Sequence, residues 1–232
     1  MSQLDIIIPI FNEGKNIQKI LSLFKKKINV KYKVYICYDK KNESGLKFIK
    51  KNKNIYFVYN KKGGPNFAIL SGIKSSKSKN ILVYMADDFH NINLINKMLK
   101  LSNEYDLIIP SRYVKGGVFK KAKFLKKLIT DIASFIINNI LRIPVRDNTN
   151  AFKFFKRKIL KDITLESTTG FTYALELVIK SYFKGYKILE IPCKWIDVTG
   201  RKSNFKVIEW LPNYIFWFLY IFYLYFKKLF FK

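Results

Sequence analysis

Short apolar runs alternate with segments of helical length in the first part of the chain, and this alternation restricts the fold more than any other feature. Apolar runs cover Leu4–Ile10, Tyr32–Tyr38 and Ile55–Tyr59, and a fourth begins at Ile81. Helical patterns occupy the connections, at residues 16–26, 45–51 and 67–75. Strands joined through helices indicate a parallel sheet with helices on both faces. Ligands of such sheets bind at the carboxyl ends of the strands.

The fourth run, residues 81–91, ends in two adjacent carboxylates, Asp87 and Asp88, followed by the only histidine of the chain, His90. Carboxylate oxygens and imidazole nitrogens are ligands that hold Mg²⁺ or Mn²⁺ against a diphosphate. We therefore expect a metal site at the carboxyl end of this strand. The alternative is that the two aspartates only cap the turn or helix of residues 91–100.

The formal net charge of +28 predicts attraction to something anionic: nucleic acid, a membrane surface or a phosphorylated ligand. Because Lys, Asn, Ile, Phe and Tyr are all abundant, part of the lysine excess reflects a compositional bias. The basic residues are scattered and form no recognised nucleic-acid-binding module, so we expect no nucleic-acid partner. A single histidine excludes histidine-based zinc sites and Ser-His-Asp catalysis elsewhere in the chain. Cys37 and Cys193, without metal-type spacing, are expected to be buried thiols in a reducing compartment.

Three later segments each allow a functional and a structural interpretation. Arg112 follows a strand at residues 107–110, where it would either neutralise a phosphate or form a surface ion pair. Residues 129–141 form an amphipathic helix that either packs on the sheet, the simpler interpretation, or lies on a membrane. Arg201 and Lys202 belong to a basic loop that either closes over a charged ligand or is a solvated charge run.

Residues 210–226 contain no charged side chain and are rich in Trp, Tyr, Phe, Leu and Ile; Lys227, Lys228 and Lys232 follow. The aromatic density favours a helix at the membrane interface over one that spans the bilayer, and a packed core helix is the alternative. The chain enters a strand directly, so we expect no secretory signal and place the protein at the cytoplasmic face of a membrane.

Six segments in chain order carry a resemblance to a known family. They are 8–13 (Ile-Pro-Ile-Phe-Asn-Glu), 38–43 with Asp39, 63–65 (Gly-Gly-Pro), 86–88 (Ala-Asp-Asp), 111–117 (Ser-Arg-Tyr-Val-Lys-Gly-Gly) and 147–152. Together they resemble the family 2 glycosyltransferases of GT-A fold, most closely the polyprenyl- or dolichyl-phosphate mannose synthases. The resemblance covers residues 4 to 205. It implies a mostly parallel, Rossmann-like α/β domain over residues 1–206 and a membrane-associating C-terminal segment over residues 207–232.

The resemblance also implies roles for individual residues. Asp87, Asp88 and His90 would hold Mg²⁺ or Mn²⁺, with Ala86 in the place of one metal-motif aspartate. The catalytic residues would be Asp88, Arg112 and Asp147. The residues expected to bind the nucleotide are Pro9, Phe11, Glu13, Asp39, Gly63, Gly64, Asp87, Arg201 and Lys202.

The implied reaction is inverting transfer of a sugar from a GDP- or UDP-sugar to a membrane acceptor. Negative charge develops on the leaving diphosphate, so a cation has to be placed there. A polyprenyl phosphate acceptor is already ionised, whereas a sugar hydroxyl on a glycan or lipid-linked saccharide would need a base, for which Asp147 is the candidate. The family's Ser-Gly before Phe152 is Asn150-Ala151 here, and its arginine before the basic loop is absent at Val198 and Thr199. These departures leave a catalytically silent membrane-bound homologue as an alternative.

Overall fold

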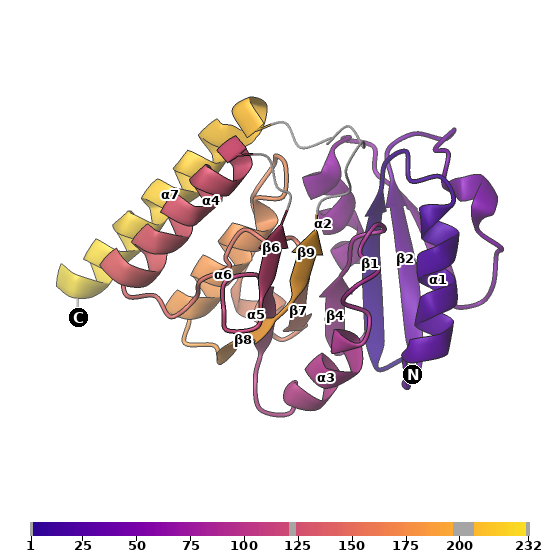
Figure 1. Cartoon of the computed structure of the whole chain (residues 1–232), viewed down its shortest axis with the longest axis horizontal. Helices are drawn as coiled ribbons and strands as arrows, with labels where there is room; N and C mark the ends of the chain where they lie inside the picture. The colour runs from indigo at the N-terminus through magenta and orange to yellow at the C-terminus, as the bar shows by residue number, and fades with distance from the viewer. Residues whose placement is uncertain (1, 121–123, 197–206, 231–232) are drawn as a thin grey trace.

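The computed structural model describes residues 2–120, 124–196 and 207–230 (Figure 1). A seven-stranded sheet forms its centre. In spatial order its strands are β3 (Ile55–Tyr59), β2 (Tyr32–Tyr38), β1 (Leu4–Ile10), β4 (Asn80–Val83), β7 (Lys153–Lys156), β5 (Leu107–Ser111) and β8 (Ile188–Pro192). Strand β7 is antiparallel to both of its neighbours, and the other pairs are parallel. The expected mostly parallel α/β sheet is therefore confirmed.

Helices cover both faces of the sheet, because successive side chains of each buried strand point to opposite faces. On β1, Ile6 and Ile8 pack with helices α1 (Asn16–Lys27) and α3 (Leu94–Leu101). Ile7 faces the other side, where the core includes α2 (Pro65–Ser75), α5 (Ile159–Asp162) and α6 (Tyr173–Phe183). The expected helix at residues 45–51 was wrong in length, since only the 3₁₀ turn η1 (Leu46–Phe48) forms there.

A second, two-stranded parallel sheet pairs β6 (Val118–Lys120) with β9 (Lys194–Ile196). Strand β6 was not predicted from the sequence, because three residues are too few to show an alternating pattern. The backbone N–H of Val118 donates to the carbonyl of Cys193 (2.9 Å), and the N–H of Cys193 donates to the carbonyl of Ser111 (2.9 Å). The segment after β5 is thereby tied to the segment after β8.

Helices α4 (Phe124–Phe135) and α7 (Val207–Phe230) both lie at one end of the molecule (Figure 1). Helix α4 continues into a π-helical turn, η2 (Ile136–Ile140), where Ile137 is buried in the core. Helix α7 packs on the core through Trp210, Trp217 and Ile221, which recur at helical spacing. No helix within the described ranges combines the length and the apolar character that a membrane span requires.

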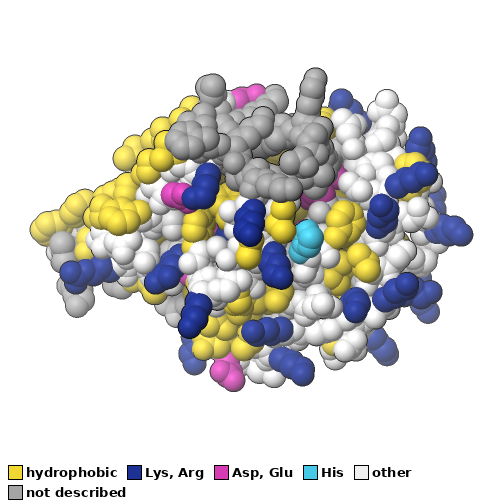
Figure 2. All heavy atoms as spheres, in the orientation of Figure 1, with side chains coloured by type: hydrophobic (Ala, Val, Ile, Leu, Met, Phe, Trp, Pro, Cys, Tyr) yellow, Lys and Arg dark blue, Asp and Glu magenta, His cyan; other side chains and the backbone are white. Residues whose placement is uncertain are grey.

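The outer sides of the same two helices carry large apolar side chains in contact with solvent. On α4 they are Leu128, Ile132 and Phe135, and on α7 they are Ile215, Phe216, Leu219, Tyr223, Phe226 and Phe230. Figure 2 shows hydrophobic side chains gathered at this end of the molecule. Packing on the core therefore holds for one face of α7 and for Ile137 in the turn after α4, and membrane contact of the exposed apolar side chains stays a prediction.

Candidate functional site

The carboxyl ends of β1, β2, β3, β4 and β5 meet at one edge of the sheet, and most of the predicted site residues lie in the loops that follow them. Because β7 is antiparallel, its first residue, Lys153, pairs with Val83 at the same edge. The turn before β7, residues 146–150, therefore joins the loops of the parallel strands. The sequence did not predict this reversal of direction.

Two carboxylates fix the loops on the predicted nucleotide side. Asp39 accepts hydrogen bonds from the backbone N–H of Gly64 (2.7 Å) and from Nδ2 of Asn60 (2.7 Å). Gly63 and Gly64 have φ of +71° and +85°, a region that favours glycine. The glycine loop thus has its shape set by backbone geometry and by Asp39.

Glu43 is the second carboxylate and is buried beneath the loop that follows β1. It accepts hydrogen bonds from the backbone N–H groups of Asn12 (2.9 Å) and Glu13 (3.3 Å). Pro9 is the sixth residue of β1, and the ring of Phe11 just beyond the strand is 38% exposed, with Nζ of Lys40 5.3 Å from its centroid. An exposed ring beside a cation suits contact with a planar, phosphorylated ligand.

Asp88 is buried and shapes the turn that follows β4. Its Oδ1 accepts the backbone N–H groups of His90 (3.0 Å) and Asn91 (3.1 Å), and Nδ2 of Asn91 donates to both carboxylate oxygens. Burial raises the pKa of Asp88, and the hydrogen bonds from Asn91 partly offset this. The capping alternative therefore describes one real function of Asp88, in a turn and not at a helix start, because α3 begins only at Leu94.

The same turn provides hard ligands for a divalent cation at the sheet edge. Oδ2 of Asp88 takes one of the four hydrogen bonds just described, so it keeps capacity for a further partner. Asp87 is half-buried and His90 is exposed (Figure 2). Among the described residues, no three His, Cys, Asp or Glu side chains converge as a complete metal site. Mg²⁺ commonly needs only one or two carboxylates when substrate phosphates complete its coordination, and this donor set fits that chemistry.

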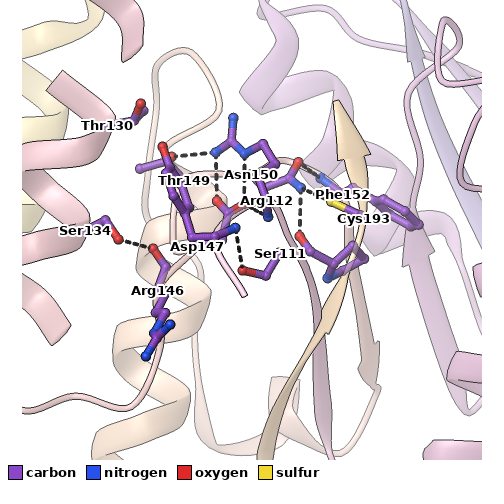
Figure 3. Close-up of polar contacts among 12 residues, drawn as sticks. Ser111, Arg112, Thr130, Ser134, Arg146, Asp147, Thr149, Asn150, Phe152 and Cys193 are labelled. Atoms are coloured by element: carbon purple, nitrogen blue, oxygen red, sulfur yellow. Dashed lines mark hydrogen bonds and ion pairs between the residues drawn. The ribbon is translucent and has the colours of Figure 1, made fainter. Parts of the chain in front are cut away.

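Arg112 and Asp147, both predicted as catalytic, form a buried ion pair with each other (Figure 3). Asp147 accepts from Nε (2.8 Å), Nη2 (2.7 Å) and the backbone N–H (2.8 Å) of Arg112. Burial alone would raise the pKa of Asp147, but the charge and hydrogen bonds of Arg112 hold it below its usual range. Arg112 is thus neither isolated nor on the surface, and its Nη1 points away from the carboxylate (Figure 3).

Glycine at position 117 allows the loop after Arg112 to fold back on itself. A Cβ at Gly117 would lie 2.7 Å from the backbone carbonyl carbon and oxygen of Arg112. The guanidinium carbon of Arg112 lies 4.4 Å from the ring centroid of Phe119 on β6. Arg112 is therefore fixed by Asp147 on one side and by the β6 segment on the other.

The sequence did not single out two groups at this site, one half-buried and one fully buried. Glu190 on β8 accepts the backbone N–H groups of Arg146 (2.8 Å) and Asp147 (2.8 Å). The fully buried Lys153 donates through Nζ to the carbonyl oxygens of Asp147 (3.3 Å) and Asn150. A charged residue next to an apolar strand was the one available signal, but the apolar pattern does not tell which strand face it occupies.

Cys193 lies between the Asp88 turn and the Arg112 pair. Burial raises the pKa of its thiol to about 12, and the negative charge of Asp147 adds to this, as does that of Asp88. Asn91 exchanges hydrogen bonds with the backbone of Lys194, next to Cys193 (2.7 and 2.9 Å). The structure thus brings the predicted metal turn and the predicted phosphate-binding arginine to the same segment.

Arg201 and Lys202, predicted to bind the nucleotide, lie outside the described residues, as do Val198 and Thr199.

Comparison with known proteins gives consistent results. A family model described as glycosyl transferase family 2 matches residues 5–164, more than half of the chain. The chain is 25% identical over 224 residues to the dolichol-phosphate mannosyltransferase of Pyrococcus furiosus, covering 91% of this chain. It is also 25% identical over 165 residues to the polyprenol monophosphomannose synthase of Mycolicibacterium smegmatis, covering 64% of this chain. The matches span 62% of the length of each of these relatives.

Solved structures extend the likeness to the fold. The glucosyl-3-phosphoglycerate synthase of Mycobacterium tuberculosis, in complex with Mn²⁺, UDP and glucosyl-3-phosphoglycerate, matches with a TM-score of 0.69 at 9% identity, over 94% of this chain and 78% of that one. The S. aureus TarS 1–349 structure matches with a TM-score of 0.58 at 17% identity, over 82% and 58%. At these identities the likeness concerns the fold alone. Taken with the family model, it shows that the chain belongs to glycosyl transferase family 2 and has the GT-A fold.

Proposed function

We propose that the protein transfers a sugar from a nucleotide diphosphate sugar to a lipid phosphate, by inverting transfer at a membrane surface. The observation that carries this proposal is the pairing of Asp147 with Arg112. A hydroxyl acceptor requires a base, and Asp147, the candidate, is buried and bound through both oxygens to a guanidinium. A phosphate acceptor is already ionised and requires none. The geometry therefore favours the phosphate.

The donor would bind across the loops that follow β1, β2 and β3. Phe11 offers an exposed ring for the base, and Asp39 and Glu43 preorganise the backbone around it. The donor phosphates would then reach the turn at Asp87 and Asp88. We propose that these carboxylates, with His90, hold Mg²⁺ or Mn²⁺; when bound, the ion would stabilise the charge of the leaving diphosphate.

Arg112 would attract the acceptor phosphate and orient it. The guanidinium uses Nε and Nη2 on Asp147, so it stays in one orientation, and Nη1 remains for an anion. Asp147 in this proposal holds Arg112 in place and removes no proton. In-line attack on the anomeric carbon then requires the acceptor and the donor to lie on opposite sides of the sugar.

We also propose that residues 207–232 associate with a membrane at its cytoplasmic face. The exposed apolar side chains of α7 and α4 form one end of the molecule, and a lipid surface would cover them. Such a surface also supplies the lipid acceptor. The relatives named for dolichol phosphate and polyprenol phosphate support the same acceptor class.

The test is a transfer assay with the purified protein, a panel of GDP- and UDP-sugars, Mg²⁺ or Mn²⁺ and a short polyprenyl phosphate. We expect metal-dependent product that Asp88→Asn abolishes. Asp106→Asn is the matched control, because Asp106 is a buried carboxylate paired with Lys156 and Lys158, away from the site. Transfer to a sugar hydroxyl in place of the lipid phosphate would overturn the proposed acceptor. Absence of both turnover and nucleotide binding would favour a silent homologue.

A further inference from the structure

Lys153 is a buried lysine for which the proposed reaction has so far no use. Its side chain is fully buried in the first residue of β7. Lysine is almost never fully buried unless it is paired. Among the described residues, however, no carboxylate lies within ion-pair distance of Nζ, which instead donates to the carbonyl oxygens of Asp147 and Asn150. Burying a cation without a paired carboxylate is unfavourable, so we expect the charge of Lys153 to have a role at this site.

The charges around Lys153 show what that charge changes. Arg112 and Asp147 neutralise each other, and Glu190, bonded to the backbone of Asp147, adds a negative charge. Without the ammonium, the group of Arg112, Asp147 and Glu190 would carry a net charge of −1 and would repel an incoming phosphate. With it, the group is neutral. Interactions between charges are stronger in a buried site than in water. The change in net charge therefore alters the electrostatic potential at Nη1 of Arg112, where the phosphate would bind.

We infer that Lys153 is a positioning residue for the acceptor phosphate: its ammonium fixes the turn of residues 147–150 and keeps the surroundings of Arg112 favourable to an anion. This inference rests on the proposed function, because it takes Arg112 to meet the acceptor. It assigns Lys153 no contact with substrate. Lys153 acts through the Asp147 carbonyl and through Arg112.

The environment of Lys153 places its loss of charge in an accessible pH range. Burial lowers the pKa of Lys153 to about 8, against the raising effect of Asp147. The other charged or titratable groups that act on it are Arg112, Glu190 and Cys193. Arg112 stays charged throughout, and the pKa of Cys193 is raised to about 12. Below a pH of about 8 the ammonium is present, and it is lost as the pH rises through that value.

The experiment is calorimetric titration of the full chain with a short polyprenyl phosphate, and separately with inorganic phosphate and with UDP and GDP. The titrations run from about pH 7 to pH 9.5, where a phosphate monoester is already mostly doubly ionised. Lys153→Met removes the charge and keeps the side-chain length. Lys156→Met is the matched control, since Lys156 lies on the same strand at the opposite sheet edge, paired with Asp106.

We expect the wild-type affinity for polyprenyl phosphate to fall as the pH passes about 8. Lys153→Met should bind it on the order of tenfold more weakly at pH 7 and lose this pH dependence, with nucleotide affinity unchanged. Lys156→Met should behave as the wild type. Wild-type affinity and pH profile in Lys153→Met would overturn the inference, and so would an equal loss of nucleotide and phosphate affinity, which indicates a purely structural role.

The two phosphates distinguish failure of this inference from failure of the proposed function. If the wild type binds inorganic phosphate but not the lipid phosphate, the proposed acceptor is wrong, and the phosphate titrations of the two variants still decide the role of Lys153. If the wild type binds neither, both are overturned.

Discussion

Replacing Arg112 by methionine tests whether the buried pair organises the site. Asp147 is fully buried, and the substitution removes the Nε and Nη2 donors of Arg112 that bind its carboxylate. The backbone N–H of residue 112 remains as a donor. Breaking a buried pair by removing one partner costs about 3–5 kcal/mol, because the remaining charge is uncompensated. The nearby ammonium of Lys153 reduces this penalty. We therefore expect a loss of about 3 kcal/mol in the free energy of unfolding at pH 7.

The pH dependence of that loss identifies its cause. In the wild type, Arg112 lowers the pKa of Asp147 in the folded state. The pair therefore contributes its full stabilisation at pH values above the unfolded-state pKa of about 3.9. This stabilisation is lost as the pH falls through the folded-state pKa. In Arg112→Met the unpaired, buried carboxylate has a raised pKa. It can take up a proton as the pH falls from 7 toward 5, which relieves the penalty. The difference between variant and wild type should therefore shrink over this range.

Asp147→Asn is the matched control for this measurement. It leaves the Arg112 guanidinium buried, and a guanidinium cannot lose its charge in this pH range. Its cost should stay constant between pH 7 and pH 5. Urea denaturation followed by tryptophan fluorescence gives both differences. A cost below about 1 kcal/mol at pH 7, or the same cost of Arg112→Met at both pH values, would refute the reasoning.

Three further substitutions test other parts of the structure. Gly72→Ala places a Cβ 2.5 Å from the Cγ2 methyl carbon of Ile7 on β1. Overpacking should therefore lower the free energy of unfolding, measured by urea denaturation, by about 1–3 kcal/mol. A neutral result would mean that α2 can move away from the sheet. Gly117→Ala creates a steric clash with the backbone carbonyl of Arg112 and should displace this residue. Calorimetry should then show weaker binding of polyprenyl phosphate, with nucleotide binding retained. An equal loss of both affinities would contradict a local effect. The double substitution Phe216→Ser and Leu219→Ser should reduce partitioning onto anionic vesicles at least about tenfold. It should not lower stability, because both side chains are exposed. Unchanged partitioning in a sedimentation assay would exclude this face from membrane contact.

The sequence predicted most of the sheet, because a strand buried on both faces is a continuous apolar run whatever its neighbours are. The bounds of β1, β2 and β3 agree with the expected runs at every residue. The same reasoning placed Asp39, Asp87, Asp88 and Arg112 at one edge of the sheet, since each follows a strand. Helix lengths and the short strand β6 were predicted less well, because few residues carry too little periodicity.

Tertiary structure alone decided which of these side chains meet. Arg112 and Asp147 are 35 residues apart, and they pair because β7 inserts antiparallel between β4 and β5. Local patterns report how deeply a segment is buried, but strand order and direction depend on the packing of the whole chain. The burial of Lys153 at the site follows from that same insertion. A lysine at the start of an apolar strand looks like a surface residue until the sheet places strands on both of its sides.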